Sequence, residues 1–251
     1  MSPTRIVERE GSLVSLSKPL VLCGFVGPGL AGLTAVGYVI DHLGLHEIAH
    51  LMSRHIPPSV VFIGNKIRHP FRIYADSSGK LGVLICEVPV EQSGLNDISG
   101  TILDWLQECG VREIVSLDGI PIRELPDNRP TFFVADEKKQ SDFRPLGFLP
   151  AESALIAGLA GSILSESLDR KIPCSSLLVH VSITLMDPGA PLTLIRALNS
   201  AYQLNITTKE LEEDEAMIHE ELNEIARQYQ KVQEQASPSA NAGKTPENMY
   251  G

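Results

Sequence analysis

The pattern of apolar and polar residues predicts alternating strands and helices over most of the chain. Residues 20–25 form a continuous apolar run, which is followed by a glycine-rich corner and by an apolar helix that ends at Gly44. A continuous apolar run without polar alternation is typical of a strand in a parallel sheet that is covered on both faces. We therefore interpret this opening stretch as the first β-α unit of an α/β domain.

Later segments repeat the same alternation. A short edge strand is expected within residues 1–18, and further strands are expected at residues 46–53, 60–64, 68–74, 81–88, 114–117, 132–135 and 177–185. Helices are expected at residues 96–109, 152–168 and 187–202, and residues 121–130 are expected to form a loop. The last of these helices begins at Asp187-Pro188, an N-capping acid followed by a proline in the first turn. This alternation predicts an α/β fold, a three-layer sandwich with a mostly parallel sheet.

The pattern changes after residue 206. From Lys209 to Glu234 there are nine acids against three bases, which predicts a long acidic C-terminal helix over residues 207–235. Its apolar residues are spaced by alternating steps of four and three from Ile218 onward, as in a heptad seam. The seam residues are Leu211, Ile218, Leu222, Ile225, Tyr229 and Val232. Such a stripe can pack on its own domain or pair with a second subunit, and the sequence leaves both open.

Residues 236–251 are small, polar and rich in proline and glycine. Because such a segment buries too little apolar surface to fold, we expect a flexible tail. Its apolar groups are in Met249-Tyr250-Gly251, where a tethered aromatic ring beside a carboxylate suits insertion into a pocket. The chain is thus expected to comprise an α/β core domain (1–206), an acidic amphipathic helix (207–235) and a flexible tail (236–251).

Charge and cysteine content narrow the class of protein. The formal net charge is -10, which argues against nucleic acid or an anionic membrane as the partner. The four cysteines are isolated in sequence and include no C-x-x-C pair, which is typical of buried thiols in a reducing compartment. We therefore expect a cytoplasmic protein without a metal site.

The glycine-rich corner allows three interpretations. Gly27, Gly29 and Gly32 spell the dinucleotide-binding pattern G-x-G-x-x-G. The acid that should end the second strand is missing, however, and Pro28 removes an amide that would face a pyrophosphate. Residues 19–40 carry no charge, but the glycine-proline corner would break a membrane-spanning helix at its middle. A buried strand-turn-helix in a soluble core is the preferred interpretation.

No catalytic motif stands out in the sequence. The nucleophile-elbow, zincin and Walker patterns do not occur, and the sequence gives no evidence of an activating base for Ser153 or Ser162, which are expected to lie on a helix. The four histidines between residues 42 and 55 are not spaced to share one helical face. We expect no catalytic residues and no cofactor. Arg68 and Arg72 form a local basic patch that could hold a phosphate, and together with Gly27 and Gly29 they are the candidate ligand corner.

Five segments together resemble the proteasome-assembly-chaperone family, in its archaeal branch. They are GFVGPGLAGLTAVGYVIDHLG at 24–44, RHPFRIYAD at 68–76, REIVSLDGI at 112–120, AGLAGSILSESL at 157–168 and DPGAPLTLIRALNSAYQLNITTKELEEDEAMI at 187–218. The resemblance implies a nucleoside-phosphorylase-like fold without that family's active site. It also implies a homo-oligomer, a tetramer or pentamer, with a C-terminal hydrophobic-tyrosine-any signature that docks between α subunits of the 20S proteasome. Met249, Tyr250 and Gly251 match that signature, although Gly251 offers only its carboxylate.

Two functional hypotheses follow from these observations. The first is a non-enzymatic, ATP-independent proteasome assembly chaperone or activator that binds the α subunits or α ring through its C-terminal tail. The alternative is a phosphorylase- or hydrolase-like enzyme that acts on a small molecule at the strand ends, using the Gly27 corner with Arg68 or Arg72. The sequence favours the first hypothesis.

Overall fold

The computed structural model describes residues 4–63, 65–126, 128–153, 155–182, 189–209 and 212–213. Within these residues, nine strands form the main sheet: β1 (Arg5–Glu8), β2 (Leu20–Phe25), β3 (His46–Met52), β6 (Phe71–Ala75), β7 (Leu81–Cys86), β8 (Glu113–Ile122), β9 (Thr131–Ala135), β10 (Leu149–Pro150) and β11 (Cys174–Ser182). A separate two-stranded hairpin consists of β4 (Val61–Ile63) and β5 (Lys66–Arg68). The helices are α1 (Ala31–His42), α2 (Leu95–Glu108), α3 (Glu137–Phe143), α4 (Gly158–Asp169) and α5 (Gly189–Tyr202).

The main sheet has a parallel centre and antiparallel flanks. Its strand order is β1-β3-β6-β7-β2-β8-β11-β9-β10. The four central strands β7, β2, β8 and β11 are parallel, whereas β1, β3 and β6 are antiparallel to their neighbours, as β9 is to β11. The connection from β6 to β7 is a short turn, which can join only antiparallel strands. The expected parallel arrangement thus holds for the centre of a mixed sheet.

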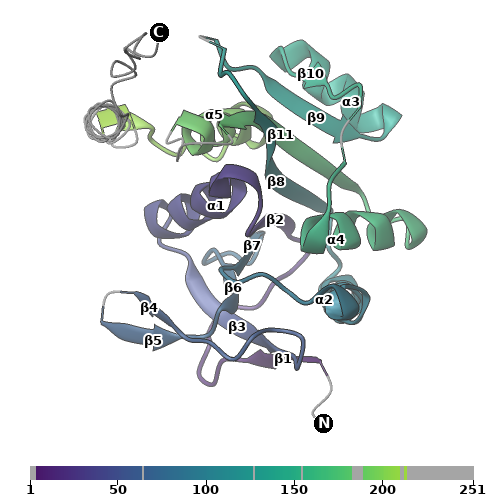
Figure 1. Cartoon of the computed structure of the whole chain (residues 1–251). Helices are drawn as coiled ribbons and strands as arrows, with labels where there is room; N and C mark the ends of the chain where they lie inside the picture. Colours follow the sequence, from purple (N-terminus) through teal and green to yellow (C-terminus); the bar gives the residue numbers. More distant parts are fainter. Residues whose placement is uncertain are drawn as a thin grey trace, which may run out of the picture.

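Helices cover both faces of the sheet and make it the middle of three layers (Figure 1). On one face α1 and α5 pack against residues such as Leu22, Val83 and Val179, and on the other α2 and α4 pack against residues such as Val21 and Leu84. Strand β2 lies at the centre, and all six of its residues are buried. The apolar run at residues 20–25 therefore forms the doubly covered strand that its composition predicts.

Several predicted boundaries differ from the observed ones. The strand expected at 68–74 is divided into β5 and β6, since Pro70 interrupts it and cannot donate to a strand ladder. Helix α4 begins at Gly158 rather than at residue 152, and Gly158 has a left-handed φ of +66°. Strand β8 continues to Ile122, into the expected loop. Helix α3 was not predicted, because its sequence EKKQSDF has no apolar periodicity.

Other expectations concern residues beyond the described ranges. The predicted cap at Asp187-Pro188 lies within residues 183–188, which the structure does not describe. Among the described helices, none is long and apolar enough to cross a membrane.

Candidate functional site

The corner after β2 requires glycines because the chain there packs closely against β8 and β11. A Cβ atom at Gly32 would lie 1.8 Å from the carbonyl oxygen of Leu117, and one at Gly27 would lie 2.6 Å from Oδ1 of Asp118. Gly29 adopts a left-handed φ of +61° and faces Val181. The three glycines therefore allow α1 and the turn before it to approach the neighbouring strands. Strand β2 and one side of α1 are buried as predicted, whereas Pro28, Gly29 and Leu30 in the turn between them are exposed.

A cavity of about 460 Å³ opens where β2 and β8 end, and we call it the strand-end cavity. The corner after β2 and the end of β8 form one wall, while the segment before α4 and the first turn of α4 form the other. The lining residues are Phe25, Val26, Gly27, Pro28, Leu117, Asp118, Gly119, Ile120, Pro121, Ser153, Leu155, Ile156, Ala157, Gly158, Leu159, Ala160 and Leu178. The carboxyl ends of parallel strands are a common place for ligands in open α/β sheets.

Asp118 is the one ionisable residue among those lining residues. Its Oδ1 accepts a hydrogen bond of 2.8 Å from the backbone N–H of Gly119. Burial raises the pKa of the Asp118 carboxyl, and the hydrogen bond from Gly119 offsets only part of that rise. Asp118 does not stand out in the sequence, because Asp-Gly is also a common turn dipeptide. The available signal was its position directly after the apolar run 114–117, at the carboxyl end of a strand.

A second and larger cavity, of about 790 Å³, contains Arg68 and Arg72, and we call it the arginine cavity. It lies between α1, the connection from β1 to β2, and the strands β3 and β6. Arg72 is only 1% exposed; its Nη1 lies 2.6 Å from Glu87 and donates to the carbonyl of His69 at 2.6 Å. Its Nε donates to the hydroxyl of Tyr74 at 2.9 Å. Arg68 donates through Nη1 to Glu47 at 2.6 Å.

These ion pairs determine what the arginine cavity can do. Burial by itself lowers the pKa of Arg72, but the hydrogen bond to Glu87 and the nearby charges outweigh it, so the net shift is upward and the guanidinium stays charged. Each arginine faces one glutamate, and the local charge is therefore compensated. A phosphate would have to compete with Glu47 and Glu87. Gly27 does not line this cavity, so the structure divides the candidate ligand corner between two places.

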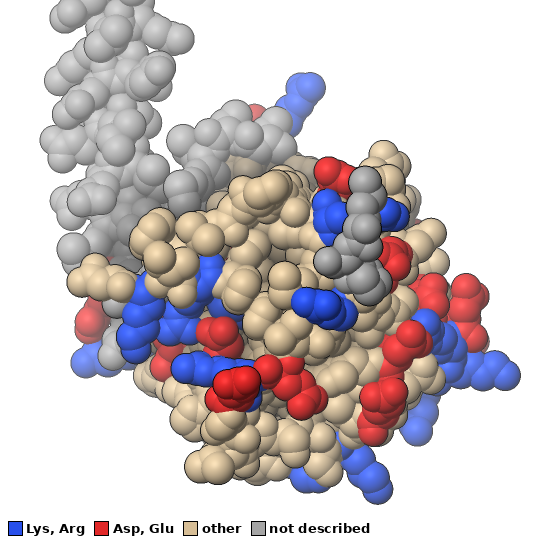
Figure 2. Space-filling model, turned by 90° about the horizontal axis from the view of Figure 1, so that it is seen from below, with Lys and Arg blue, Asp and Glu red and all other residues tan. Residues whose placement is uncertain are grey.

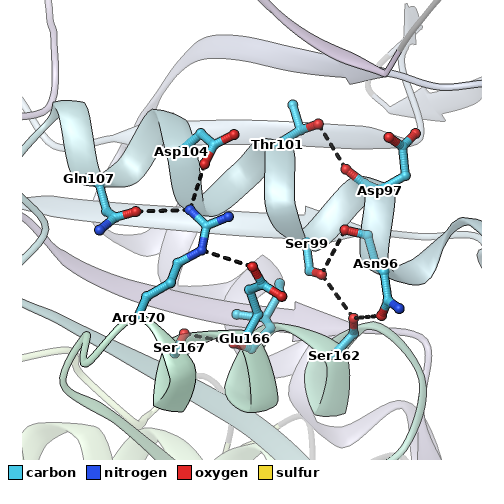
Figure 3. Close-up of polar contacts among 11 residues, drawn as sticks. Asn96, Asp97, Ser99, Thr101, Asp104, Gln107, Ser162, Glu166, Ser167 and Arg170 are labelled. Carbon is cyan, nitrogen blue, oxygen red and sulfur yellow. Dashed lines mark hydrogen bonds and ion pairs between the residues drawn. The ribbon is translucent and has the colours of Figure 1, made fainter.

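The two serines considered as nucleophiles lie apart from each other. Ser162 lies on α4, where its Oγ is 2.9 Å from Oγ of Ser99 and 3.4 Å from Oδ1 of Asn96 (Figure 3). A serine hydroxyl and an asparagine carboxamide are not basic, so neither partner can act as a general base for Ser162. Ser153 lines the strand-end cavity instead.

The same view shows how α2 and α4 are held together. Arg170, just beyond α4, donates to Asp104 at 2.6 Å and to Gln107 at 2.9 Å on α2, and also to Glu166 at 2.9 Å on α4 (Figure 3). Side-chain hydrogen bonds to Asp104 raise the pKa of Arg170, so this residue stays charged. We interpret this helix pair as a structural contact.

The histidines between residues 42 and 55 also have separate surroundings. His42 stacks on Tyr38, and His55 lies 3.4 Å from Glu91. His50 stacks on His69 with ring centroids 3.7 Å apart. Burial and the neighbouring His69 lower the pKa of His50. Within the described part of the chain, no three potential metal ligands lie close enough to hold an ion.

One face of the molecule carries charged side chains of both signs. Figure 2 shows basic and acidic side chains interspersed on the face seen from below, with neither sign gathered into a large patch.

The remaining predicted site residues lie outside the described residues. They are the seam positions Leu211, Ile218, Leu222, Ile225, Tyr229 and Val232, and the tail positions Met249, Tyr250 and Gly251.

Comparisons with known proteins identify one matching family and several similar solved structures. Residues 21–226 match the model of the PAC2 family. A solved structure of a protein with unknown function from Thermoplasma acidophilum is 44% identical, with a TM-score of 0.75 over 88% of this chain and 91% of that chain. Pyrococcus furiosus PbaA, an archaeal homolog of proteasome-assembly chaperone, is 21% identical, with a TM-score of 0.82 over 94% of this chain and 96% of that chain. PbaB from the same organism, an archaeal proteasome activator, is 23% identical, with a TM-score of 0.78 over 90% of this chain and 100% of that chain.

Proposed function

The chain belongs to the PAC2 family, and from this membership we propose that it is a non-enzymatic, ATP-independent proteasome assembly chaperone or activator. Family membership over residues 21–226 is the observation that carries the proposal. The likeness in fold to PbaA and PbaB supports it, since one is a homolog of a proteasome-assembly chaperone and the other a proteasome activator. The proposed partners are the α subunits of the 20S proteasome.

In this proposal the folded body is a scaffold and the C-terminal tail is the anchor. The ring of Tyr250 and the side chain of Met249 supply apolar surface, and the terminal carboxylate at Gly251 supplies a charge that a lysine can pair with. A single short tail makes a weak contact. Several tails on one homo-oligomer raise the effective concentration, so that a weak individual contact still holds the complex.

The homo-oligomer is proposed to form through the acidic helix. Leu222→Glu places a charge in the predicted heptad seam, where burying it is costly, and should dissociate the oligomer. Asn223→Glu adds the same charge one position away from the seam and is the matched control. Light scattering would measure the mass of each variant. An unchanged mass for Leu222→Glu would reject the pairing between subunits.

A binding experiment tests the proposed partner. The full chain would be immobilised and offered the archaeal 20S proteasome and, separately, free α subunits and free β subunits. We expect retention of the proteasome and of the α subunits, but not of the β subunits. Retention of free α subunits alone would assign the protein to assembly, and retention of the mature particle with faster peptide hydrolysis would assign it to activation. If the immobilised protein retains none of them, the proposal fails.

The enzyme hypothesis has less support from the described residues. In the strand-end cavity the lining offers Asp118 as the one ionisable group and Ser153 as the one hydroxyl. In the arginine cavity Arg68 and Arg72 are engaged by glutamates. We therefore do not propose a reaction.

A further inference from the structure

The strand-end cavity has the composition of a small-molecule site. Its volume of about 460 Å³ lies within the range of ligand pockets, which are mostly apolar with a few polar groups that fix orientation. Its lining is apolar side chains and backbone, apart from Asp118 and Ser153. Leu155 and Val26 line the cavity and are nevertheless 92% and 41% exposed. Apolar surface of this kind gains free energy when a ligand covers it.

The position of Asp118 defines the chemistry of a ligand. Its Oδ1 accepts from the N–H of Gly119, so one oxygen is fixed by the backbone. Among the described side chains that line the cavity there is no basic group to pair with the carboxylate. A partly buried carboxylate without a cationic partner is costly, and a ligand that brings a positive charge relieves that cost. We propose that the strand-end cavity binds a small organic cation, with an apolar body against the cavity walls and a protonated amine or amidinium that donates to Asp118.

The absence of a side chain at Gly27 leaves space for the carboxylate of Asp118 in the strand-end cavity. Gly27 faces Asp118, and a Cβ atom there would lie 2.6 Å from its Oδ1. Any other residue at position 27 would displace the carboxylate. The glycine corner therefore serves this site by leaving space for Asp118, and not by binding a phosphate through its amides.

The N-terminus of helix α4 favours a ligand of the opposite charge, and the binding test must distinguish its effect from that of Asp118. Its first turn lies on the cavity wall, and its N-cap residue Ala157 makes no side-chain capping bond. Uncapped amides at a helix N-terminus favour negative charge. If they governed the site, the ligand would be an anion; if Asp118 governs it, the ligand is a cation.

Three probes with one aromatic body distinguish these cases. They are 1-naphthylmethylamine (cationic), 1-naphthalenemethanol (neutral) and 1-naphthoate (anionic), each titrated into the full chain at pH 7 and followed by calorimetry and by NMR. We expect the amine to bind most tightly, the alcohol roughly ten- to a hundredfold more weakly and the acid not at all. These ratios follow from the strength of a charge-assisted hydrogen bond.

Three variants locate the binding. Asp118→Asn keeps the size of the side chain and the acceptor for Gly119, and should weaken the amine by the same factor while leaving the alcohol unchanged. Asp41→Asn makes the same chemical change at an exposed residue that lines the arginine cavity, and should change nothing. Ala157→Leu adds bulk at an exposed position of the cavity wall and should weaken both the amine and the alcohol, even if Asp118→Asn fails to fold.

The inference is independent of proteasome binding and can fail separately from it. It is overturned if the wild-type chain does not bind the amine up to its solubility limit. It is also overturned if the acid binds as tightly as the amine, or if Asp118→Asn and Ala157→Leu both bind the amine as the wild type does.

Discussion

The arginine cavity and the strand-end cavity differ in how their charges are satisfied. In the arginine cavity, Arg72 is 1% exposed and lies 2.6 Å from Glu87, and Arg68 lies 2.6 Å from Glu47. In the strand-end cavity, Asp118 is the one ionisable residue among the described lining, and its hydrogen bond comes from the backbone of Gly119. The larger cavity therefore contains arginines that are paired within the protein, and the smaller one contains an acid that has no basic partner in its lining.

This difference separates structural polar groups from those that are available to a ligand. A buried ion pair with hydrogen bonds to neighbours is a common feature of folded proteins and needs no ligand to explain it. An isolated carboxylate in an apolar cavity costs stability, and such costs are typical of functional sites. Arg68 and Arg72, which the sequence suggests for ligand binding, thus form ion pairs within the arginine cavity. Asp118, which does not stand out in the sequence, lies in the strand-end cavity, our candidate for ligand binding.

Replacement of Arg72 should give the largest loss of stability. Arg72→Met leaves Glu87 partly buried without its partner, and should lower the free energy of unfolding by about 3 kcal/mol. Urea denaturation would measure this loss. The double variant Arg72→Met/Glu87→Leu replaces the whole pair by apolar groups and should recover part of the loss, since the hydroxyl of Tyr74 and the carbonyl of His69 still lack their donor. A loss below about 1 kcal/mol for Arg72→Met would contradict a structural role for the pair.

Two glycines of α1 should respond in opposite directions to the same substitution. Gly32→Ala places a Cβ atom 1.8 Å from the carbonyl oxygen of Leu117, and should destabilise the protein by about 2–3 kcal/mol because α1 must move away from β8. Gly37 lines the arginine cavity, and a Cβ atom there would meet no atom of the described neighbouring elements within 4 Å. Gly37→Ala should therefore stabilise the helix by about 0.5–1 kcal/mol. Thermal and urea unfolding of both variants would show whether their signs differ, as this packing requires.

A smaller effect is expected for Asp118→Asn, and it should depend on pH. Burial raises the pKa of Asp118 in the folded state above its unfolded value. Folding therefore favours the protonated acid, and the stabilisation present at low pH is lost as the pH rises through the folded-state pKa. At pH 7 the variant should melt about 2 °C higher than the wild type, and the difference should vanish only below the unfolded-state pKa, toward about pH 3.

Calorimetric scans across this pH range would measure both melting temperatures. Asp41→Asn, at an exposed position, should show no such convergence. A lower melting temperature for Asp118→Asn at pH 7 would mean that Asp118 is a structural residue, and would remove the distinction between the two cavities.

The sequence predicts the centre of this fold well, because the signals there are local. The apolar run 20–25, the glycine corner and the amphipathic segment 96–109 correspond to β2, the turn before α1, and α2. The match to the PAC2 family over residues 21–226 supports the family resemblance, whereas its archaeal C-terminal signature stays a prediction. Helix α3 escapes prediction because its sequence has no apolar periodicity, although Asp136 caps it by accepting from the N–H of Lys139.

The candidate sites are harder to predict, because their chemistry depends on contacts between distant segments. Arg68 and Arg72 appear as a basic patch in sequence, but Glu47 and Glu87 reach them from other elements. Asp118 becomes notable only when Gly27 and the first turn of α4 are placed around it. The proposed anchor at Met249, Tyr250 and Gly251 rests on the family resemblance and stays a prediction.

The most direct test of the proposed function is the affinity of the 20S proteasome for the full chain and for Tyr250→Ala, measured by surface plasmon resonance. Asn248→Ala serves as the control within the tail, and Asp118→Asn as the control within the body. We predict that Tyr250→Ala loses at least roughly thirtyfold in affinity, as expected for a buried aromatic anchor, while both controls bind as the wild type does. Equal binding by Tyr250→Ala and the wild type would show that the tail is not the anchor and would contradict the account.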